Sequence, residues 1–498
     1  MSENFLNGLA NETNKTRTTN GAEAFKSTKS DLLDFFSVAG AMRETDENTI
    51  TRKFRLAYQE NPLLAMKALF LTRNVRGGLG ERRVPKLIVQ DMVKYQPESI
   101  KKNLGIMAQF GRWDDILWLL DTELESQVIE IIKSQLAEDM QGVLNGEAIS
   151  SLAKWLPSIN TSSKETRKKG RKVATALGLT EKLYRKTLSK MRKYLDVVEV
   201  KMASNKWDEI KYSAVTSKAM KNYNRAFAKH DETGFAEYLV SLEKGETKIN
   251  STTLYPYELV SQVIGLGQKG MESVVNAQWE ALPNYVEGEH NVLVMADVSG
   301  SMNGMPLNSS IGLAMYCAER NSGAFKNKFM TFSTNPQLVS LKGSTFAERA
   351  KNLSQASWDM STDFQKALGT ILDTAVNNNL EQGELPEKLI VVSDMQFNDA
   401  RGNGYSWRRQ ENTSENWGFY GKMKQMYKDK GYNIPQIVFW NVNSPKDSYM
   451  VDCDCEGVGL VSGQSPSMFK YVLTGDVTTP YEMMVDALND PIYDCVKA

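Results

Sequence analysis

The stretch that decides the fold is HNVLVMADVSGS, residues 290–301. It begins as a short run of large apolar residues and continues, from Asp297, as a loop of small and polar residues. An apolar run of this length that ends in turn formers predicts a buried β-strand. The carboxylate of Asp297 and the hydroxyls of Ser299 and Ser301 would then lie together at the end of that strand.

The residues that follow repeat this pattern. The expected strands cover residues 290–296, 329–333, 337–341, 388–393, 436–441 and 457–462, and the expected helices cover residues 309–320, 364–376, 417–430 and 480–488. Apolar strands that alternate with helices predict a mostly parallel, doubly wound, Rossmann-like sheet. Ligands of such sheets bind at the carboxyl ends of the strands, which is where Asp297 is expected.

Two more oxygen donors are expected at the same edge of the sheet. Asp394 directly follows the strand predicted over residues 388–393, and Thr362 precedes a predicted helix. Ser361 or Asp363 could replace Thr362 as the donor of that loop. Carboxylates and hydroxyls are hard ligands, which suit Mg²⁺ or another hard divalent cation rather than zinc. The alternative is a polar loop that caps the following helix without a metal.

This order of donors resembles the metal-ion-dependent adhesion site of von Willebrand factor A domains. The resemblance spans residues 286–498 and assigns Asp297, Ser299 and Ser301 to the first loop, Thr362 to the second and Asp394 to the third. In that family the ion usually keeps one position for an outside oxygen, often the carboxylate of a partner protein. The resemblance therefore implies a site for binding.

The first half of the chain has a different pattern. Residues 1–28 are polar with few apolar anchors, which predicts a mobile arm. Residues 29–285 suggest an array of short amphipathic helices joined by tight turns, without a repeat of fixed period. Asn61 before Pro62 is one helix start, and Gly77 with Gly78 is a stop.

Positive charge is concentrated within this helical half. The chain has no net charge, yet residues 164–229 hold 19 Lys or Arg against 6 Asp or Glu, a net charge of +13. Such a segment favours RNA as a partner, although a solvated helical face would have the same composition. The candidate RNA contacts in this segment are Lys168, Lys169, Arg171, Lys172, Arg185, Lys186, Arg192 and Lys193. Trp155, Tyr184, Tyr194 and Trp207 are available to stack on bases, or to fill the core.

A loop rich in glycine and arginine, RNVRGGLGERR, occupies residues 73–83. It lacks the ending of a phosphate-binding Walker loop, and no strand precedes it. One interpretation is a corner between two helices, with glycines in left-handed conformations and arginines solvated or paired with Glu81. The other is an anion contact, in which the arginines meet nucleic-acid phosphates. The residues concerned are Arg73, Arg76, Arg82 and Arg83.

The order of the two halves resembles Ro ribonucleoproteins, in which a helical TROVE module precedes a von Willebrand factor A domain. The strings RGGLGER at residues 76–82 and FGRWDD at residues 110–115 look more specifically like a related family of plants, microbes and phages, itself of unassigned function. The Ro resemblance implies that the helices close into a ring that binds small or misfolded RNA.

Several function classes are disfavoured by composition. Two histidines, His230 and His290, leave little material for acid–base catalysis, so we expect no enzyme. Four cysteines form no disulfide framework, and Cys453 with Cys455 is a weak candidate for a soft metal. No apolar run reaches the roughly 20 residues of a membrane span, so we expect a cytoplasmic protein.

The sequence thus predicts a Ro-like protein whose helices bind small or structured RNA with a single-stranded end. Its C-terminal domain would bind Mg²⁺ to recognise a ligand or partner. The alternative is an assembly factor without RNA, whose metal site takes the carboxylate of a protein partner.

Overall fold

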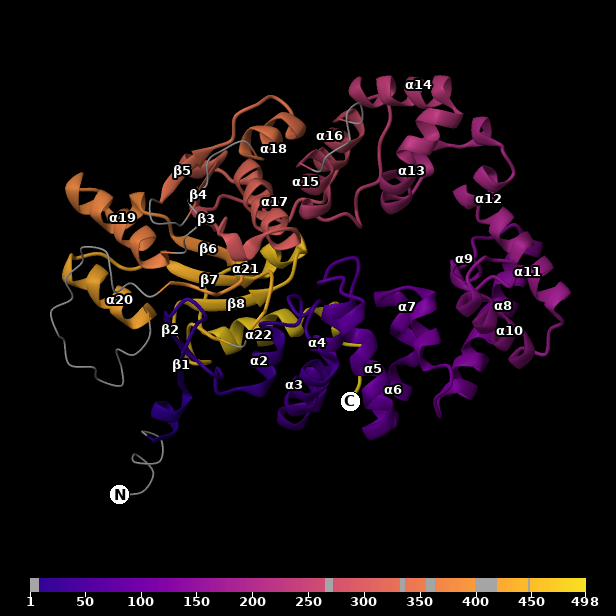
Figure 1. The fold of residues 1–498 in the computed structure, drawn as a ribbon, viewed down its shortest axis with the longest axis horizontal. Helices are drawn as coiled ribbons and strands as arrows, with labels where there is room; N and C mark the ends of the chain where they lie inside the picture. The colour runs from indigo at the N-terminus through magenta and orange to yellow at the C-terminus, as the bar shows by residue number, and fades with distance from the viewer. Residues whose placement is uncertain (1–8, 265–271, 332–335, 355–362, 399–418, 447) are drawn as a thin grey trace.

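The computed structural model describes residues 9–264, 272–331, 336–354, 363–398, 419–446 and 448–498. The fold is mixed α/β, with a mostly helical N-terminal region followed by a six-stranded sheet (Figure 1). No helix in these ranges is both long and apolar enough to cross a membrane.

The sheet has the strand order β5-β4-β3-β6-β7-β8. Its strands are β3 (Val292–Ala296), β4 (Lys328–Thr331), β5 (Gln337–Ser340), β6 (Lys388–Ser393), β7 (Gln436–Asn441) and β8 (Val458–Ser462). Only β5 is antiparallel to its neighbour. Every residue of β3, β6 and β8 is buried, as expected for strands covered on both faces.

The strand order reverses between β3 and β6. The chain proceeds from β3 to β4 and β5 on one side, then returns to place β6, β7 and β8 on the other. Ala296 pairs with Val392 at the ends of these two central strands. The loops that leave β3 and β6 therefore begin side by side, and sheets of this kind bind their ligands at such a reversal of strand order.

Helices cover the sheet. They are α17 (Met305–Arg320), α18 (Phe346–Ser354), α19 (Phe364–Asn377), α20 (Phe419–Asp429), α21 (Phe469–Leu473) and α22 (Pro480–Leu488). Helix α17 packs on β3, β4 and β6, and α22 packs on β8. The sequence predicted neither α18 nor α21, whereas the predicted strands and the other four helices are present. Residues 332, 333, 417 and 418 of these predictions lie outside the described residues, and the other ends differ by a few residues.

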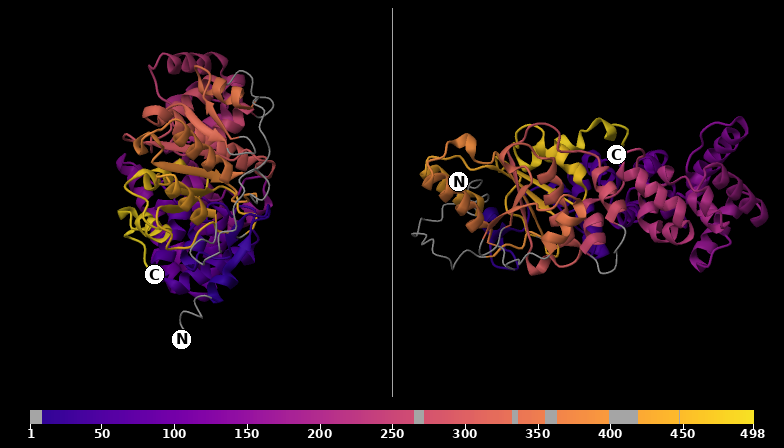
Figure 2. Two further views of the ribbon diagram at one scale, coloured as in Figure 1. Left: turned by 90° about the vertical axis from the view of Figure 1, so that its left-hand side faces the viewer. Right: turned by 90° about the horizontal axis from the view of Figure 1, so that it is seen from above.

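The N-terminal helices leave the sheet, extend to one side and return to it (Figures 1 and 2). They are α2 (Asp31–Phe36), α3 (Glu47–Glu60), α4 (Pro62–Arg73), α5 (Arg83–Tyr95), α6 (Pro97–Asn103), α7 (Met107–Phe110), α8 (Glu125–Asn145), α9 (Leu152–Trp155), α10 (Lys164–Ala176), α11 (Glu181–Tyr194), α12 (Val198–Ala203), α13 (Ser217–His230), α14 (Glu232–Glu243), α15 (Pro256–Ile264) and α16 (Glu272–Glu280). The side chain of Asn61 caps α4, with Pro62 in its first turn. The returning helix α15 packs on α17.

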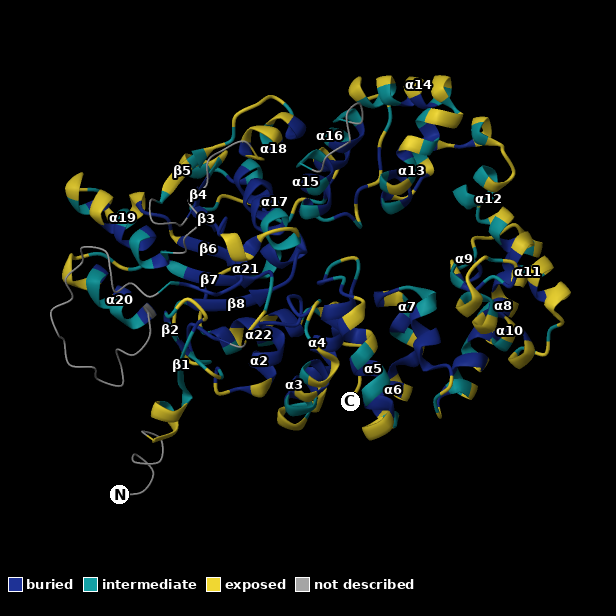
Figure 3. Ribbon diagram, in the orientation of Figure 1, coloured by how far each residue is buried: buried dark blue, intermediate teal, exposed yellow. Residues whose placement is uncertain are grey.

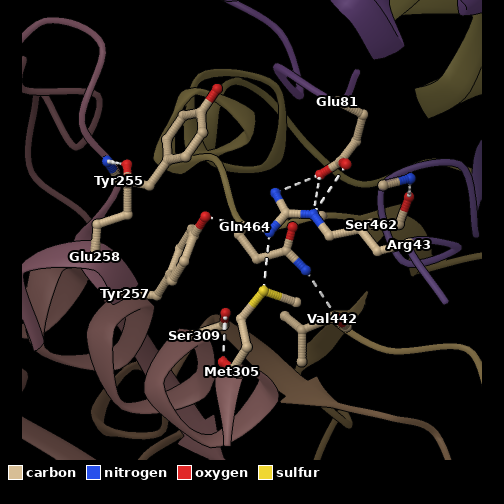
Figure 4. Close-up of polar contacts among 12 residues, drawn as sticks. Arg43, Glu81, Tyr255, Tyr257, Glu258, Met305, Ser309, Val442, Ser462 and Gln464 are labelled. Carbon is tan, nitrogen blue, oxygen red and sulfur yellow. Dashed lines mark hydrogen bonds and ion pairs between the residues drawn. The ribbon is translucent and has the colours of Figure 1, made fainter. Parts of the chain in front are cut away.

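A polar cluster joins the two ends of the helical region to helix α17 (Figure 4). Arg43 Nε donates to both carboxylate oxygens of Glu81, at 2.8 and 2.9 Å. The same guanidinium contacts the Tyr257 hydroxyl at 3.2 Å and the Met305 sulfur at 2.9 Å. Gly80 has a φ of +66°, and a Cβ there would collide with the Tyr255 hydroxyl. The start of the helical region, its end and helix α17 therefore meet at one point.

The apolar cores do not divide at residue 285. One core runs from the N-terminal helices through the sheet to Val496, because the C-terminal tail lies on those helices. Tyr493 stacks on Phe110 at 5.6 Å, and Asn103 binds the backbone of Lys497. A second, smaller core is built around Phe227 and Phe235. The expected division into residues 29–285 and 286–498 follows secondary structure and does not separate independent cores.

The N-terminal segment corrects a prediction. Within the arm predicted over residues 1–28, β1 (Lys15–Arg17) and β2 (Glu23–Phe25) form an antiparallel hairpin. Phe25 pairs with Tyr449, and the turn at Gly21 pairs with Asn398. Backbone hydrogen bonds hold this segment, so its low content of apolar residues was a poor guide.

Candidate metal centre and basic surface

Asp297 lies at the carboxyl end of β3 and is fully buried. Its Oδ1 accepts a hydrogen bond from the amide of Ser299 at 2.9 Å, and its Oδ2 accepts one from the Ser393 hydroxyl at 2.5 Å. The hydroxyls of Ser299 and Ser301 are 3.1 Å apart. One carboxylate and two hydroxyls are thus gathered in the first loop, where the sequence predicted them.

Asp394 occupies the equivalent position after β6 and is 1% exposed. Its Oδ1 accepts from the amide of Gln396 at 3.1 Å, and the nearby Ser301 hydroxyl favours the charged form of this carboxyl. Its Oδ2 is buried without any hydrogen-bond partner in the described part of the chain. The charge of Asp394 acts on Asp297, and with the unsatisfied oxygen this places Asp394 in one constellation with the first loop.

Among the residues that the structure describes, no positive charge compensates the two carboxyls. Their partners in the described ranges are backbone amides and hydroxyls, with no lysine or arginine among them. Burial, followed by the charge of Asp394, raises the pKa of Asp297 to about 6. Burial also raises the pKa of Asp394. Two buried acids without a cation are costly to ionise together, and a bound divalent cation would remove that cost.

The residues present fit a hard cation. They offer two carboxylates and two hydroxyls, which are the oxygens that Mg²⁺ prefers, and water can complete its six positions. Thr362 and Ser361 lie outside the described residues. Asp363 accepts from the amide of Lys366 at 2.9 Å and caps α19, so its carboxylate already has a structural role.

Ser393 and Gln396 belong to the site, although neither was predicted from the sequence. Ser393 could have been found from the sequence, because it is the polar residue that ends the apolar run of β6 and directly precedes Asp394. Gln396 gave no such signal. Neither cysteine candidate belongs to a group of three metal-binding acidic, Cys or His residues within the described ranges. Burial raises the pKa of Cys453 to about 11 and that of Cys455 to about 12.

The Gly-Arg loop is largely committed to internal contacts. Buried Arg73 donates to Asp115 at 2.6 Å, so it is unavailable to RNA and that prediction is wrong. Arg82 pairs with Asp114 at 2.5 Å. Arg83 donates to the carbonyl of Thr45 at 2.7 Å, and exposed Arg76 donates to that of Gln109. Glu81 pairs with Arg43 rather than with an arginine of the loop. These contacts fit the corner between helices better than an anion site.

Helices α10 and α11 present most of the other predicted cations to solvent (Figure 3). Exposed members are Lys168, Lys169, Arg171, Arg185, Lys186 and Lys193. Lys169 and Arg171 form surface pairs with Glu165 and Glu181 at 2.9 and 3.1 Å. Such pairs contribute little energy and would exchange readily for phosphate. Lys172 is half-buried between Asp121 and Glu125 and is less available.

The candidate stacking residues separate into two groups. Tyr184 is fully buried and donates to the carbonyl of Pro157, so its prediction as a base contact is wrong. Trp207 stacks on His230 at 4.4 Å. Trp155 is half-buried with the Arg112 guanidinium 4.2 Å from its ring centre, and Tyr194 is 39% exposed. Tyr184 is thus excluded, whereas Trp155, Tyr194 and Trp207 keep part of their surface exposed for contact with bases.

Arg192 has a structural role, which corrects its assignment to RNA. Its guanidinium donates to the carbonyls of Ala153 and Leu156, at 2.8 and 2.7 Å, beside the last turn of α9. We expect Arg192→Ala to lower the free energy of unfolding by about 2 kcal/mol, because it leaves these acceptors without a partner. Lys193→Ala, the exposed neighbour, should change it by less than about 0.5 kcal/mol. Urea unfolding measures both, and equal stability of the two variants would contradict this role.

Comparisons with known proteins identify two families whose descriptions state no function. The model described as "Domain of unknown function (DUF2828)" matches residues 18–145 and 145–289, more than half of the chain. "Domain of unknown function (DUF7788)" matches residues 291–491. A relative from Acanthamoeba polyphaga mimivirus, "Uncharacterized protein L728", is 29% identical over 517 residues, which cover 95% of this chain and 87% of the relative.

Proposed function

Since this chain belongs to the DUF2828 family, whose description states no function, we propose a function from its own residues. It is an RNA-binding protein of Ro-like organisation, in which helices hold small or structured RNA. Its C-terminal domain binds Mg²⁺ and uses the ion to recognise a ligand or partner.

The observation that carries RNA binding is the exposed positive charge of α10 and α11. Lys168, Lys186 and Lys193 are exposed, and within the described residues no ion pair neutralises them. Phosphates would displace counterions from such a surface, which is the main source of affinity for nucleic acids. Trp155 and Tyr194 lie on or beside these helices and would add stacking contacts with unpaired bases.

We assign the sheet to the von Willebrand factor A class. Support comes from a central β3 flanked by parallel strands, an antiparallel edge strand β5, and oxygen donors at the carboxyl ends of β3 and β6. Asp297, Ser299, Ser301 and Asp394 would hold the ion, and Thr362 would add a donor from the loop before α19. The bound ion would supply a Lewis-acidic position for an outside oxygen.

We propose no catalytic turnover. His230 stacks on Trp207, in the helical region. His290 contacts the carbonyl of Glu287 and precedes β3, whereas Asp297 follows the other end of that strand. Neither histidine is thus positioned to serve as a base at the metal loops.

The second candidate function is protein assembly without RNA. It is favoured by the buried pair of carboxyls, because a divalent ion held there would keep affinity for the carboxylate of a partner. Both candidate functions require the bound ion, so they are distinguished by whether the protein binds RNA.

To test this proposal, the full chain is purified at low salt and the ratio of its absorbance at 260 nm to that at 280 nm is measured. We expect a ratio raised by copurified RNA, which ribonuclease digestion then lowers to that of free protein. The control is the same preparation washed at high salt, which should release the RNA. A preparation free of nucleic acid that also fails to bind added structured RNA would support protein assembly instead.

A further inference from the structure

The N-terminal hairpin docks on the loop that follows Asp394. The Thr18 hydroxyl donates to the carbonyl of Phe397 at 2.6 Å. The amide side chain of Asn20 donates to the carbonyl of Gln396 at 2.6 Å. Asn20 and Gln396 are 376 residues apart in the sequence, so the contact joins the N-terminus directly to the candidate metal centre.

Gln396 is the link between the hairpin and the metal loop. It is 3% exposed, and its side-chain oxygen accepts from the amide of Thr19 at 2.8 Å. Its side-chain nitrogen lies 3.4 Å from the carbonyl of Asp394 and 3.3 Å from the Ser448 hydroxyl. Its own amide donates to Asp394 Oδ1 at 3.1 Å. One buried side chain thus contacts the hairpin while its backbone orients the carboxylate.

The bend between Asp394 and Gln396 carries a conformational cost. Met395 has a φ of 61°, a left-handed conformation that costs free energy for a residue with a side chain. Surrounding contacts must therefore hold it. The hairpin supplies contacts on both residues after the bend, Gln396 and Phe397.

We propose that the turn at residues 18–20 and Gln396 are positioning elements for Asp394, which couple docking of the hairpin to metal binding. This inference rests on the proposed metal site. A docked hairpin holds Asp394 in the orientation that binds the ion, and a bound ion holds the loop in the form that the hairpin recognises. The two events therefore strengthen each other by the same factor.

The first test is calorimetric titration of the full chain with Mg²⁺. Gln396→Met removes the side-chain link at similar volume, and Asn20→Ala removes a contact at the turn. Each is expected to weaken Mg²⁺ binding about 10-fold, as changes behind metal ligands commonly do. The matched control is Glu12→Gln, which breaks the surface ion pair with Lys15 inside the N-terminal segment and leaves the contacts between the hairpin and the metal loop in place. It should bind Mg²⁺ as the wild type does.

The second test separates coupling from a merely structural role. Hydrogen exchange of residues 15–25 is measured in the wild type with and without saturating Mg²⁺. We expect exchange to slow by about 10-fold with the ion, by reciprocity, and to be insensitive to it in Gln396→Met. A wild type that binds Mg²⁺ with unchanged exchange of the hairpin would overturn the coupling alone. A wild type that binds no divalent ion would overturn the metal site and this inference together.

Discussion

Asp297→Ala and Asp297→Asn are expected to abolish Mg²⁺ binding while the C-terminal sheet stays folded. Each removes a charged ligand at the end of a strand, so the loss of affinity should exceed the roughly 10- to 100-fold that changes behind a ligand cause. Titration calorimetry with Mg²⁺ or Mn²⁺ measures the affinity. Asp139→Asn is the matched control, because Asp139 is also a buried acid, 3% exposed, but accepts hydrogen bonds from Ser150 in the helical region. Unchanged affinity in the Asp297 variants would contradict the assignment.

The same site should make metal-free stability depend on pH. A folded-state pKa of about 6 for Asp297, against roughly 3.9 when unfolded, means that the folded state binds the proton more tightly. The contribution of this group is therefore neutral below pH 4 and becomes unfavourable as the pH rises to 6. It reaches about 3 kcal/mol above that pH.

Asp297→Asn cannot ionise and should not show that loss. In EDTA at pH 7.5, we expect the Asn variant to unfold at a higher urea concentration than the wild type. Mg²⁺ should restore the wild type and leave the variant unchanged. A metal-free wild type whose stability relative to the Asn variant is the same at pH 4 and pH 7.5 would contradict this account of the buried pair.

Much of the sheet could be predicted because its strands are short apolar runs. The runs before Asp297 and Asp394 had to be buried, and an acid directly after each had to lie at the carboxyl edge. The donors of the first loop followed from that position. Residues behind them did not, because Gln396 acts through contacts with a hairpin that is remote in the sequence.

The positive residues show why composition could not define the basic surface. Arg73 and Arg192 count toward positive charge in the sequence, yet one pairs with Asp115 and the other binds carbonyls near α9. Those partners are 42 and 39 residues away, so no local pattern identifies them. Lys168, Lys186 and Lys193 are exposed as predicted, whereas Lys172 is half-buried between Asp121 and Glu125. Helical periodicity alone separates the exposed lysines from the buried Leu188 and Met191.

Changing Lys168, Arg185, Lys186 and Lys193 together to Gln is expected to weaken RNA binding by on the order of 100- to 1000-fold at about 50 mM salt. Removal of one phosphate contact should also make the log–log dependence of affinity on salt less steep by about 0.7. With four cations removed, the slope of the variant should therefore be smaller by about 3. Filter binding of a structured RNA with a single-stranded 3′ tail, across a salt series, measures both quantities.

A second quadruple variant controls for net charge, since the removal of any four cations weakens long-range attraction to RNA. Lys326, Lys342, Lys428 and Lys430 are exposed on the C-terminal region, and their change to Gln alters the charge equally. We expect its salt slope to match the wild type, because long-range attraction without phosphate contact releases few condensed counterions. Equal slopes for all three proteins would place the RNA away from α10 and α11. A weaker affinity and a smaller slope in the first variant alone would locate the RNA path on these helices.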